Sequence, residues 1–173
     1  MPLLQSFVVR CVIPFTVVAM LGIYDGFAQV NKDALVGTWK LISYKDTTED
    51  GKVKDSFGKN PTGFLTYTAD GRMMAIITAD GQKPLSTRDF VAAPSEEKAE
   101  AFASVIAYGG RYTVMGDRVI HHVEVSWIQN IVNTDQIRFV VKLDGNQLVL
   151  RTAASTMGGI PLAKQELVWE RVK

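Results

Sequence analysis

Residues 111–127 read RYTVMGDRVIHHVEVSW, and they contain two β-type runs on either side of one tight turn. Valine, isoleucine, threonine and tyrosine are frequent in both runs, and Gly116-Asp117 between them is a turn dipeptide. β-Branched and aromatic residues favour strands, and a short turn of this kind joins antiparallel neighbours. The stretch therefore predicts a β-hairpin in which residues 111–115 pair with residues 118–127.

The same pattern of short apolar runs and tight turns recurs along the rest of the chain. Asp-Gly dipeptides at 50–51, 70–71, 80–81 and 144–145 separate the runs. A sheet of many antiparallel strands either closes or stacks, and closure removes its exposed edges. We therefore expect an all-β fold, a single closed antiparallel β-barrel of about eight or nine strands. The predicted strands are 38–47, 53–57, 63–68, 73–78, 111–115, 118–127, 136–143, 147–152 and 165–172.

Two helical segments are expected beside these strands. Residues 94–97, Pro-Ser-Glu-Glu, resemble a helix start with carboxylates in the first turn, and apolar residues then recur at helical spacing up to Ala107. This predicts an α-helix around residues 95–107, ended by Gly109-Gly110, with its apolar stripe on the barrel wall or over one mouth. Residues 31–36 are expected to form a short helical turn that plugs the barrel bottom.

The N-terminal residues 1–28 have the order of a secretory signal peptide. A basic Arg10 precedes the uncharged apolar run 11–23, and Gly26-Phe27-Ala28 fits the small-x-small pattern of a cleavage site. The run has 13 residues, whereas a membrane-spanning helix needs roughly 20. We therefore expect cleavage after residue 28, a mature domain over 29–173 without a membrane span, and a secreted or periplasmic location.

Composition and charge exclude several classes of function. The chain of 173 residues has 19 Lys and Arg against 18 Asp and Glu, so its charge gives no electrostatic basis for binding nucleic acid. Its single cysteine, Cys11, would be lost with the signal peptide. The only two histidines, His121 and His122, are adjacent and would point to opposite faces of a strand, so they cannot bind one metal together. We therefore expect no metal and no cofactor.

Five segments carry a family resemblance. They are LVGTWKL at 35–41, GFLTYTADGRM at 63–73, YGGRYTV at 108–114, HHVEVS at 121–126 and LVWER at 167–171. Together they resemble the bacterial and fungal lipocalin-like domain family over residues 35–172. The resemblance implies a calycin-type barrel with a helix inserted before the later strands. It also implies that Trp39, in the Gly-x-Trp motif, closes the barrel bottom and that Arg171 lies against its indole.

Alternation along the strands predicts which side chains line the barrel, because successive strand residues face opposite sides of a sheet. Lys40, Arg138 and Lys142 should point outward. A shift of one residue would reverse this and place His122, Glu124, Ser126 and Arg138 in a polar pocket. The residues predicted to point inward are Trp39, Leu41, Ser43, Val119, His121, Val123, Val125, Trp127, Ile137, Phe139, Val141 and Leu143.

The predicted lining is largely aliphatic and aromatic, which favours a protein that binds a small hydrophobic molecule inside the barrel. The candidate ligand-binding residues are His121, Val123, Trp127, Tyr112 and Phe139. An alternative is a cofactor-independent enzyme, such as a cyclase, isomerase or hydratase, that uses the same cavity. In that case His121 would be the catalytic residue, because the ordinary histidine pKa near 6.5 suits proton transfer.

Overall fold

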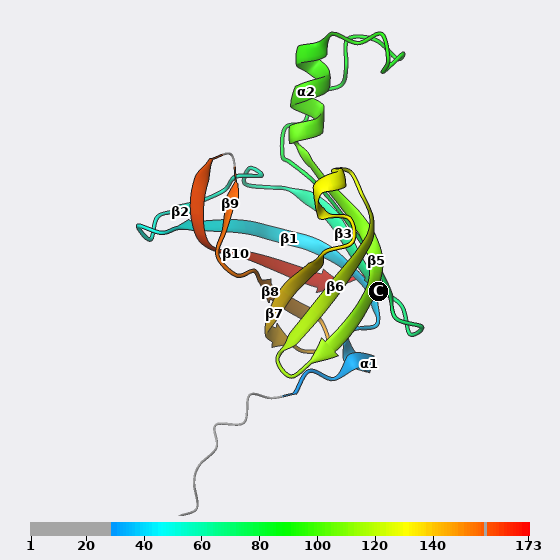
Figure 1. Ribbon diagram of the computed structural model, residues 1–173, viewed down its shortest axis with the longest axis vertical. Coiled ribbons are helices and arrows are strands. Elements are labelled where there is room, and N and C mark those ends of the chain that lie inside the picture. Colours follow the sequence, from blue (N-terminus) through cyan, green and yellow to red (C-terminus); the bar gives the residue numbers. More distant parts are fainter. Residues whose placement is uncertain (1–28, 158) are drawn as a thin grey trace, which may run out of the picture.

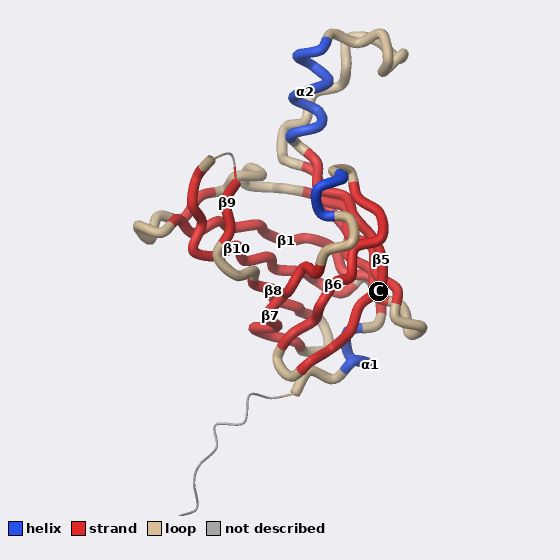
Figure 2. The backbone as a smooth tube through the Cα atoms, viewed as in Figure 1, coloured by secondary structure: helices blue, strands red, loops and turns tan. Residues whose placement is uncertain are grey.

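The computed structural model describes residues 29–157 and 159–173. The expected signal peptide, residues 1–28, lies outside these residues. The described chain consists mainly of antiparallel strands, with two α-helices and one 3-10 helix (Figures 1 and 2). In chain order the elements are α1 Lys32–Leu35, β1 Gly37–Thr48, β2 Val53–Lys54, β3 Thr62–Tyr67, β4 Arg72–Thr78, α2 Ser95–Ala103, β5 Val105–Met115, β6 Arg118–Ser126, η1 Gln129–Ile131, β7 Asp135–Leu143, β8 Gln147–Arg151, β9 Ser155–Met157 and β10 Ile160–Arg171.

Eight of the strands close into a barrel, as the sequence predicted. Their hydrogen-bonded order is β1-β3-β4-β5-β6-β7-β8-β10, and β10 pairs again with β1. The two short strands, β2 and β9, extend the sheet outside this ring, beside β1 and β10 respectively. The fold is therefore an all-β closed antiparallel barrel of eight strands with two additional ones.

The start of β5 differs from the prediction. Residues 105–107 pair with β4 instead of continuing a helix, so the predicted helix end at Ala107 was wrong. Gly109 and Gly110 lie inside β5 rather than ending a helix. A Cβ atom at Gly110 would lie 2.0 Å from the carbonyl oxygen of His122. Glycine is therefore required there because the β5 and β6 backbones approach so closely.

Helix α2 does not cover the barrel, contrary to the expectation. None of its residues is buried, and the side chain of Phe102 is 52% exposed. Figure 1 shows the helix projecting from the end of the barrel opposite α1. One member of the predicted apolar stripe, Ile106, belongs to β5 instead of the helix. The apolar residues left on α2 form only a short stripe, and none of them is buried against the barrel. Among the described helices, none is long and apolar enough to cross a membrane.

Helix α1 plugs the opposite end of the barrel, as expected. Its residue Leu35 is fully buried, and the indole Nε1 of Trp39 donates a hydrogen bond to the Leu35 carbonyl oxygen at 2.8 Å. The guanidinium carbon of Arg171 lies 4.0 Å from the centre of the Trp39 ring system, a cation–π contact. Arg171 also donates to the carbonyl oxygens of Ala34 and Val36, at 2.6 and 2.7 Å. The expected roles of Trp39 and Arg171 are therefore confirmed.

Gly37 makes this arrangement possible. It has a φ angle of +133°, which side-chain-bearing residues rarely adopt. A Cβ atom at this position would lie 2.6 Å from the Arg171 guanidinium. Any other residue here would therefore strain the backbone and force the end of the Arg171 side chain to shift.

Irregularities in strand pairing reverse part of the predicted lining. In β1 the register shifts between Leu41 and Ser43, so Trp39 and Leu41 point inward as predicted, whereas Tyr44 takes the inward position expected of Ser43. In β6 a bulge opposite Gly109 and Gly110 turns Val125 outward, where it is 61% exposed. The inward predictions for Ser43 and Val125 were therefore wrong. Those for Val119, His121 and Val123 are confirmed, since all three are buried.

Strand β7 has the opposite parity from that predicted. Arg138 pairs with the inward Val119, and it therefore faces the barrel interior instead of solvent. Leu143 still packs on the core, because a register shift between Val140 and Lys142 restores the predicted parity near the strand end. The outward prediction for Arg138 was wrong, and so were the inward predictions for Ile137, Phe139 and Val141.

We predict that Trp39→Ala lowers the free energy of unfolding by about 3–5 kcal/mol, because it leaves a cavity at the closed end and removes the surface under Arg171. Chemical denaturation measures this loss. Ile42→Ala is the matched control on the same strand, since Ile42 is half exposed, and it should change the free energy of unfolding by less than about 1 kcal/mol. Equal denaturation midpoints for wild type and Trp39→Ala would contradict the role assigned to Trp39.

Candidate functional site

A cavity of about 410 Å³ lies inside the barrel. Most of its wall is apolar, and strands β3, β4, β5, β8 and β10 contribute to that wall. Trp127, Ile128 and Ile131, in the segment after β6, border it near the base of α2, where the Trp127 amide donates to the Ala107 carbonyl oxygen at 2.8 Å. The apolar wall residues are Leu65, Ala75, Ile77, Ile106, Leu150, Leu167 and Trp169, and the polar ones are Tyr44, Tyr108, His121, Gln136, Arg138, Thr152, Ser155, Thr156 and Gln165.

A chain of hydrogen bonds centred on His121 forms the main polar part of the cavity. His121 is 1% exposed. Its Nε2 lies 2.7 Å from the Tyr67 hydroxyl, and its Nδ1 lies 2.9 Å from the Tyr108 hydroxyl. The guanidinium Nη2 of Arg138 donates to that same Tyr108 hydroxyl at 3.3 Å. Strands β3, β5, β6 and β7 each supply one member of this chain.

The surroundings of His121 keep its ring neutral. Burial lowers the pKa of His121 well below its ordinary value of 6.5, and the positive charge of Arg138 and the neighbouring His122 lower it further. Burial also raises the pKa of Tyr67 well above its ordinary value of 10.0. At neutral pH the ring therefore has one N–H donor and one unprotonated nitrogen, and both face tyrosine hydroxyls.

A second polar group lies on the β1 and β10 side of the cavity. Gln165 Nε2 donates to the Tyr44 hydroxyl at 2.6 Å and to Asp46 Oδ1 at 3.0 Å. Asp46 is fully buried and does not line the cavity. Burial and the nearby Asp46 carboxylate raise the pKa of Tyr44, so its hydroxyl stays protonated.

The structure brings two of the five predicted ligand-binding residues to this cavity. His121 and Trp127 border it, whereas Val123 is buried in the core beside it and is not part of the wall. Tyr112 lies at the closed end, where its hydroxyl donates to the Thr68 carbonyl oxygen at 2.9 Å. Phe139 lies on the outer face, with the Arg118 guanidinium 5.0 Å from its ring centre.

Sequence reasoning missed Gln136 as a wall residue, and it placed Arg138 in a pocket only under the alternative shift of one residue. Tyr112 was preferred to Tyr108 as the tyrosine at the cavity. Gln136 reaches the wall because it stands directly opposite His121 in the β6–β7 register. The apolar pattern of β7 does not reveal that register. Ile137 and Val141 are apolar and alternate like inward residues, although both are exposed.

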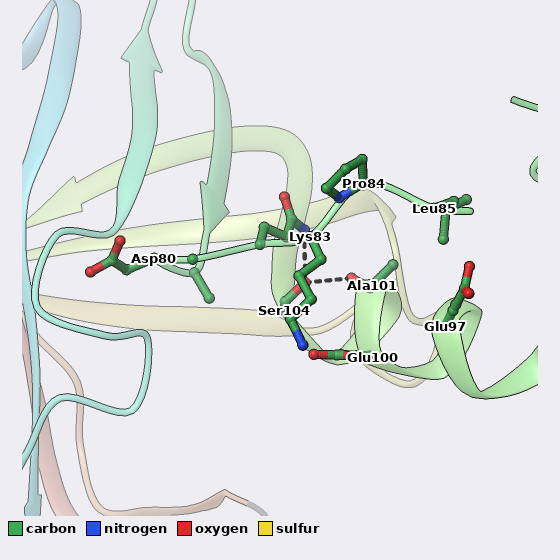
Figure 3. Close-up of a pocket in the computed structure, with 11 residues that line it drawn as sticks. Asp80, Lys83, Pro84, Leu85, Glu97, Glu100, Ala101 and Ser104 are labelled. Carbon is green, nitrogen blue, oxygen red and sulfur yellow. Dashed lines mark hydrogen bonds between the residues drawn. The ribbon is translucent and has the colours of Figure 1, made fainter. Parts of the chain in front are cut away.

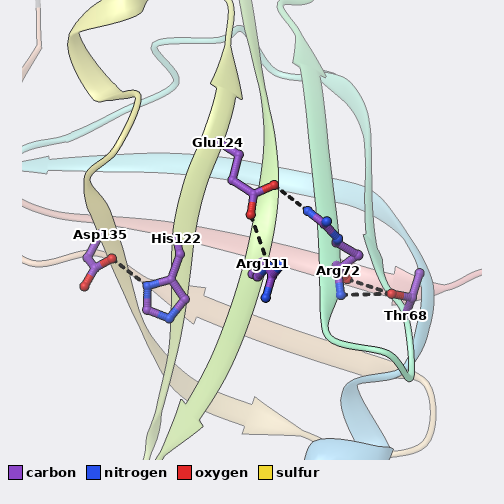
Figure 4. A network of polar contacts seen from close by, with 6 residues as sticks. All are labelled: Thr68, Arg72, Arg111, His122, Glu124 and Asp135. Carbon is purple, nitrogen blue, oxygen red and sulfur yellow. Dashed lines mark hydrogen bonds and ion pairs between the residues drawn. The ribbon is translucent and has the colours of Figure 1, made fainter.

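The alternative polar pocket is not assembled. Figure 4 shows His122 and Glu124 with their charged partners on the outer wall of the barrel. His122 Nδ1 lies 2.6 Å from Asp135 Oδ1, while Glu124 forms ion pairs with Arg72 and, at 3.2 Å, with Arg111. Only Arg138 of that alternative set lines the cavity, and it does so together with His121. Across residues 29–157 and 159–173, no three His, Cys, Asp or Glu side chains are grouped as a metal site would require.

A second hollow, also of about 410 Å³, lies outside the barrel between the loop after β4 and helix α2 (Figure 3). Lys83, Glu97 and Glu100 contribute to its wall, and Ser104 Oγ donates to the Ala101 carbonyl oxygen at 2.8 Å. All of its charged side chains are at least partly exposed to solvent. The barrel cavity, with its buried histidine and tyrosines, is therefore the candidate site.

We predict that the free energy of unfolding falls as the pH drops below about 6.5, because unfolded His121 takes up a proton that the folded chain excludes. Tyr67, Tyr108 and Arg138 face the folded ring, and none of them can supply a negative charge to stabilise an imidazolium. One excluded proton corresponds to a slope of about 1.4 kcal/mol per pH unit. Denaturant titrations between about pH 5 and 7.5 measure it.

The control for this prediction compares two adjacent positions. His121→Gln should flatten the pH dependence, whereas His122→Gln, on the outer face, should retain the His121 contribution. A His121→Gln variant with the same slope as wild type would show that His121 is not the responsible group.

Comparison with known proteins places this geometry in a family context. The sequence model of the lipocalin-like domain family matches residues 36–172. No curated protein matches the chain significantly. Similar solved structures include a lipocalin-like protein from Bacteroides uniformis, at 15% identity and a TM-score of 0.42, with 80% of this chain and 99% of that one covered. A redesigned β-barrel is similar at 13% identity and a TM-score of 0.40, with 82% and 95% covered.

The family match extends over most of the described chain, from the residue before the Gly-x-Trp motif to the residue after β10, the strand that ends at Arg171. It includes every strand of the barrel and every residue of the cavity wall. The chain therefore belongs to the lipocalin-like domain family.

Proposed function

We propose that this protein binds a small, largely apolar molecule inside its barrel. The observation that carries the proposal is the internal cavity of about 410 Å³ with its mostly apolar wall. This volume lies within the range of about 300–1,000 Å³ that is typical of small-molecule sites. The plug formed by α1, Trp39 and Arg171 closes one end, so a ligand would enter near Trp127 and the base of α2.

The alternative function, a cofactor-independent cyclase, isomerase or hydratase, draws less support. A general base needs a free lone pair within reach of the substrate. Both ring nitrogens of His121 already lie within 3 Å of a tyrosine hydroxyl, that of Tyr67 or that of Tyr108. Proton transfer to His121 would have to pass through Tyr108, and binding requires no such transfer.

The location that we propose is secreted or periplasmic. Its support is the order of the N-terminal residues. Arg10, the uncharged run 11–23 and the small-x-small site Gly26-Phe27-Ala28 follow the pattern of a signal peptide. Cleavage after Ala28 would also remove Cys11, the only cysteine. The remaining domain would contain no thiol to oxidise, which suits an oxidising compartment.

We predict that Ala75→Phe weakens the binding of an apolar fluorescent probe by tenfold or more, because the added phenyl group fills part of the cavity. Ala75 is buried and lines the cavity, whereas its neighbour Ile76 is exposed on the outside of β4. Ile76→Phe is therefore the matched control and should leave the affinity unchanged. Fluorescence titration measures both, with circular dichroism to verify folding. Equal affinities for folded Ala75→Phe and wild type would place the probe outside the barrel.

We also predict that the exported protein begins at Gln29. Intact-mass analysis of the protein recovered from its native host measures the mass of the mature chain. A full-length mass in the exported fraction would contradict cleavage after Ala28.

A further inference from the structure

The hydrogen-bond chain Tyr67–His121–Tyr108–Arg138 has a definite direction. Because the His121 ring is neutral, it donates at one nitrogen and accepts at the other. Tyr67 is fully buried, and its hydroxyl makes no other hydrogen bond within the described part of the chain. An unpaired buried hydroxyl hydrogen is costly, so the Tyr67 hydroxyl donates to Nε2. The ring proton is then on Nδ1 and is donated to the Tyr108 oxygen.

This direction of the hydrogen bonds leaves the hydroxyl hydrogen of Tyr108 without an acceptor in the part of the chain that the structure describes. The Tyr108 oxygen accepts from His121 Nδ1 at 2.9 Å and from Arg138 Nη2 at 3.3 Å, so both of its lone pairs are occupied. Its own hydroxyl hydrogen has no acceptor among the hydrogen bonds of the described residues. Since Tyr108 lines the cavity, this hydrogen is available to a ligand there.

Arg138 adds a positive charge at the same place. Its Nη1 donates to the Ile137 carbonyl oxygen at 3.0 Å, and no carboxylate of the described residues lies within 4.0 Å of its guanidinium. Asp46, the buried carboxylate that accepts from Gln165, forms no ion pair with it. Arg138 therefore faces a largely apolar cavity without a counter-ion. Such a charge is stabilised by an anion that accepts its remaining hydrogen bonds.

We propose that the barrel binds an acid with an apolar body, and that its carboxylate lies between the Arg138 guanidinium and the Tyr108 hydroxyl. His121 is a positioning residue in this site, because it holds the Tyr108 oxygen as an acceptor and thereby directs the Tyr108 hydrogen to the ligand. The aliphatic wall formed by Leu65, Ile77 and Leu167 contacts the body of the acid. This inference rests on the proposed function, since it names the chemical class of the bound molecule.

The test compares three probes that share one apolar body and differ in the head group: decanoic acid, decanol and decylamine. Isothermal titration calorimetry at neutral pH measures their dissociation constants with the wild-type protein. Charge-assisted hydrogen bonds contribute enough that the acid should bind about tenfold or more tightly than the alcohol. The amine should bind most weakly, because its ammonium would face Arg138.

Single substitutions then test whether Arg138 and Tyr108 cause the preference for the acid over the alcohol. Arg138→Gln should abolish the preference for the acid over the alcohol, and Arg138→Lys should retain part of it because the charge remains. Tyr108→Phe should reduce acid binding by several-fold and leave decanol binding nearly unchanged. The matched control is Arg118→Gln. Arg118 is on the neighbouring strand and contacts the ring of Phe139 on the outer face of the barrel, so its loss should not change the preference for the acid.

The outcomes separate this inference from the proposed function. An acid preference that disappears in Arg138→Gln and persists in Arg118→Gln supports both. Equal binding of acid and alcohol to the wild-type protein overturns the inference and leaves the proposed function intact. Failure of all three probes, together with failure of the apolar fluorescent probe, overturns both.

Discussion

The contact between the Arg171 guanidinium and the Trp39 indole holds the barrel together at its closed end. Trp39 is in the first strand and Arg171 ends the last one, and these two strands pair along most of their length. Arg171 also binds the last carbonyl groups of α1, so the plug is attached to the strands that it closes. Without the pairing of β1 with β10 the eight strands would form an open sheet with two unpaired edges. The contact between Arg171 and Trp39 stabilises that pairing at the closed end of the barrel.

Closure at one end divides the interior into a filled part and a hollow part. Trp39, Tyr67 and Tyr112 fill the space above α1, whereas the space between Ala75 and Leu167 remains open. His121 lies at the boundary and links the fully buried Tyr67 to Tyr108 on the cavity wall. Because its ring is buried, the histidine stays neutral and acts through the direction of its hydrogen bonds rather than through charge. The only cationic side chain on the cavity wall is Arg138, among the residues that the structure describes.

Three register shifts decide which side chains reach that wall. The shift at Gly110 turns Val125 outward, the shift after Leu41 brings Tyr44 inward, and the one after Val140 restores Leu143 to the core. Each shift adds one residue to a strand, and one added residue exchanges the two faces of everything beyond it. In β7 the parity is reversed from the start of the strand, because Gln136 and Arg138 pair with the inward His121 and Val119 in unbroken register. The apolar Ile137 therefore lies outside, although alternation alone predicts the reverse.

The sequence by itself determined the closed all-β barrel, the plug before Gly37 and the inward position of His121. These three features depend on local signals, namely turn dipeptides, strand propensity and the alternation of residues 118–123 before any bulge. The contact of Arg171 with Trp39 followed only from the resemblance to the lipocalin-like domain family. Only the tertiary structure decided that Tyr108 belongs to a strand, that α2 stands away from the barrel and that Arg138 faces the cavity. These depend on pairing between segments far apart in the chain, such as Ile106 with Ile77 and Val119 with Arg138. A pairing partner and a bulge are properties of two strands together, so neither strand's own sequence specifies them.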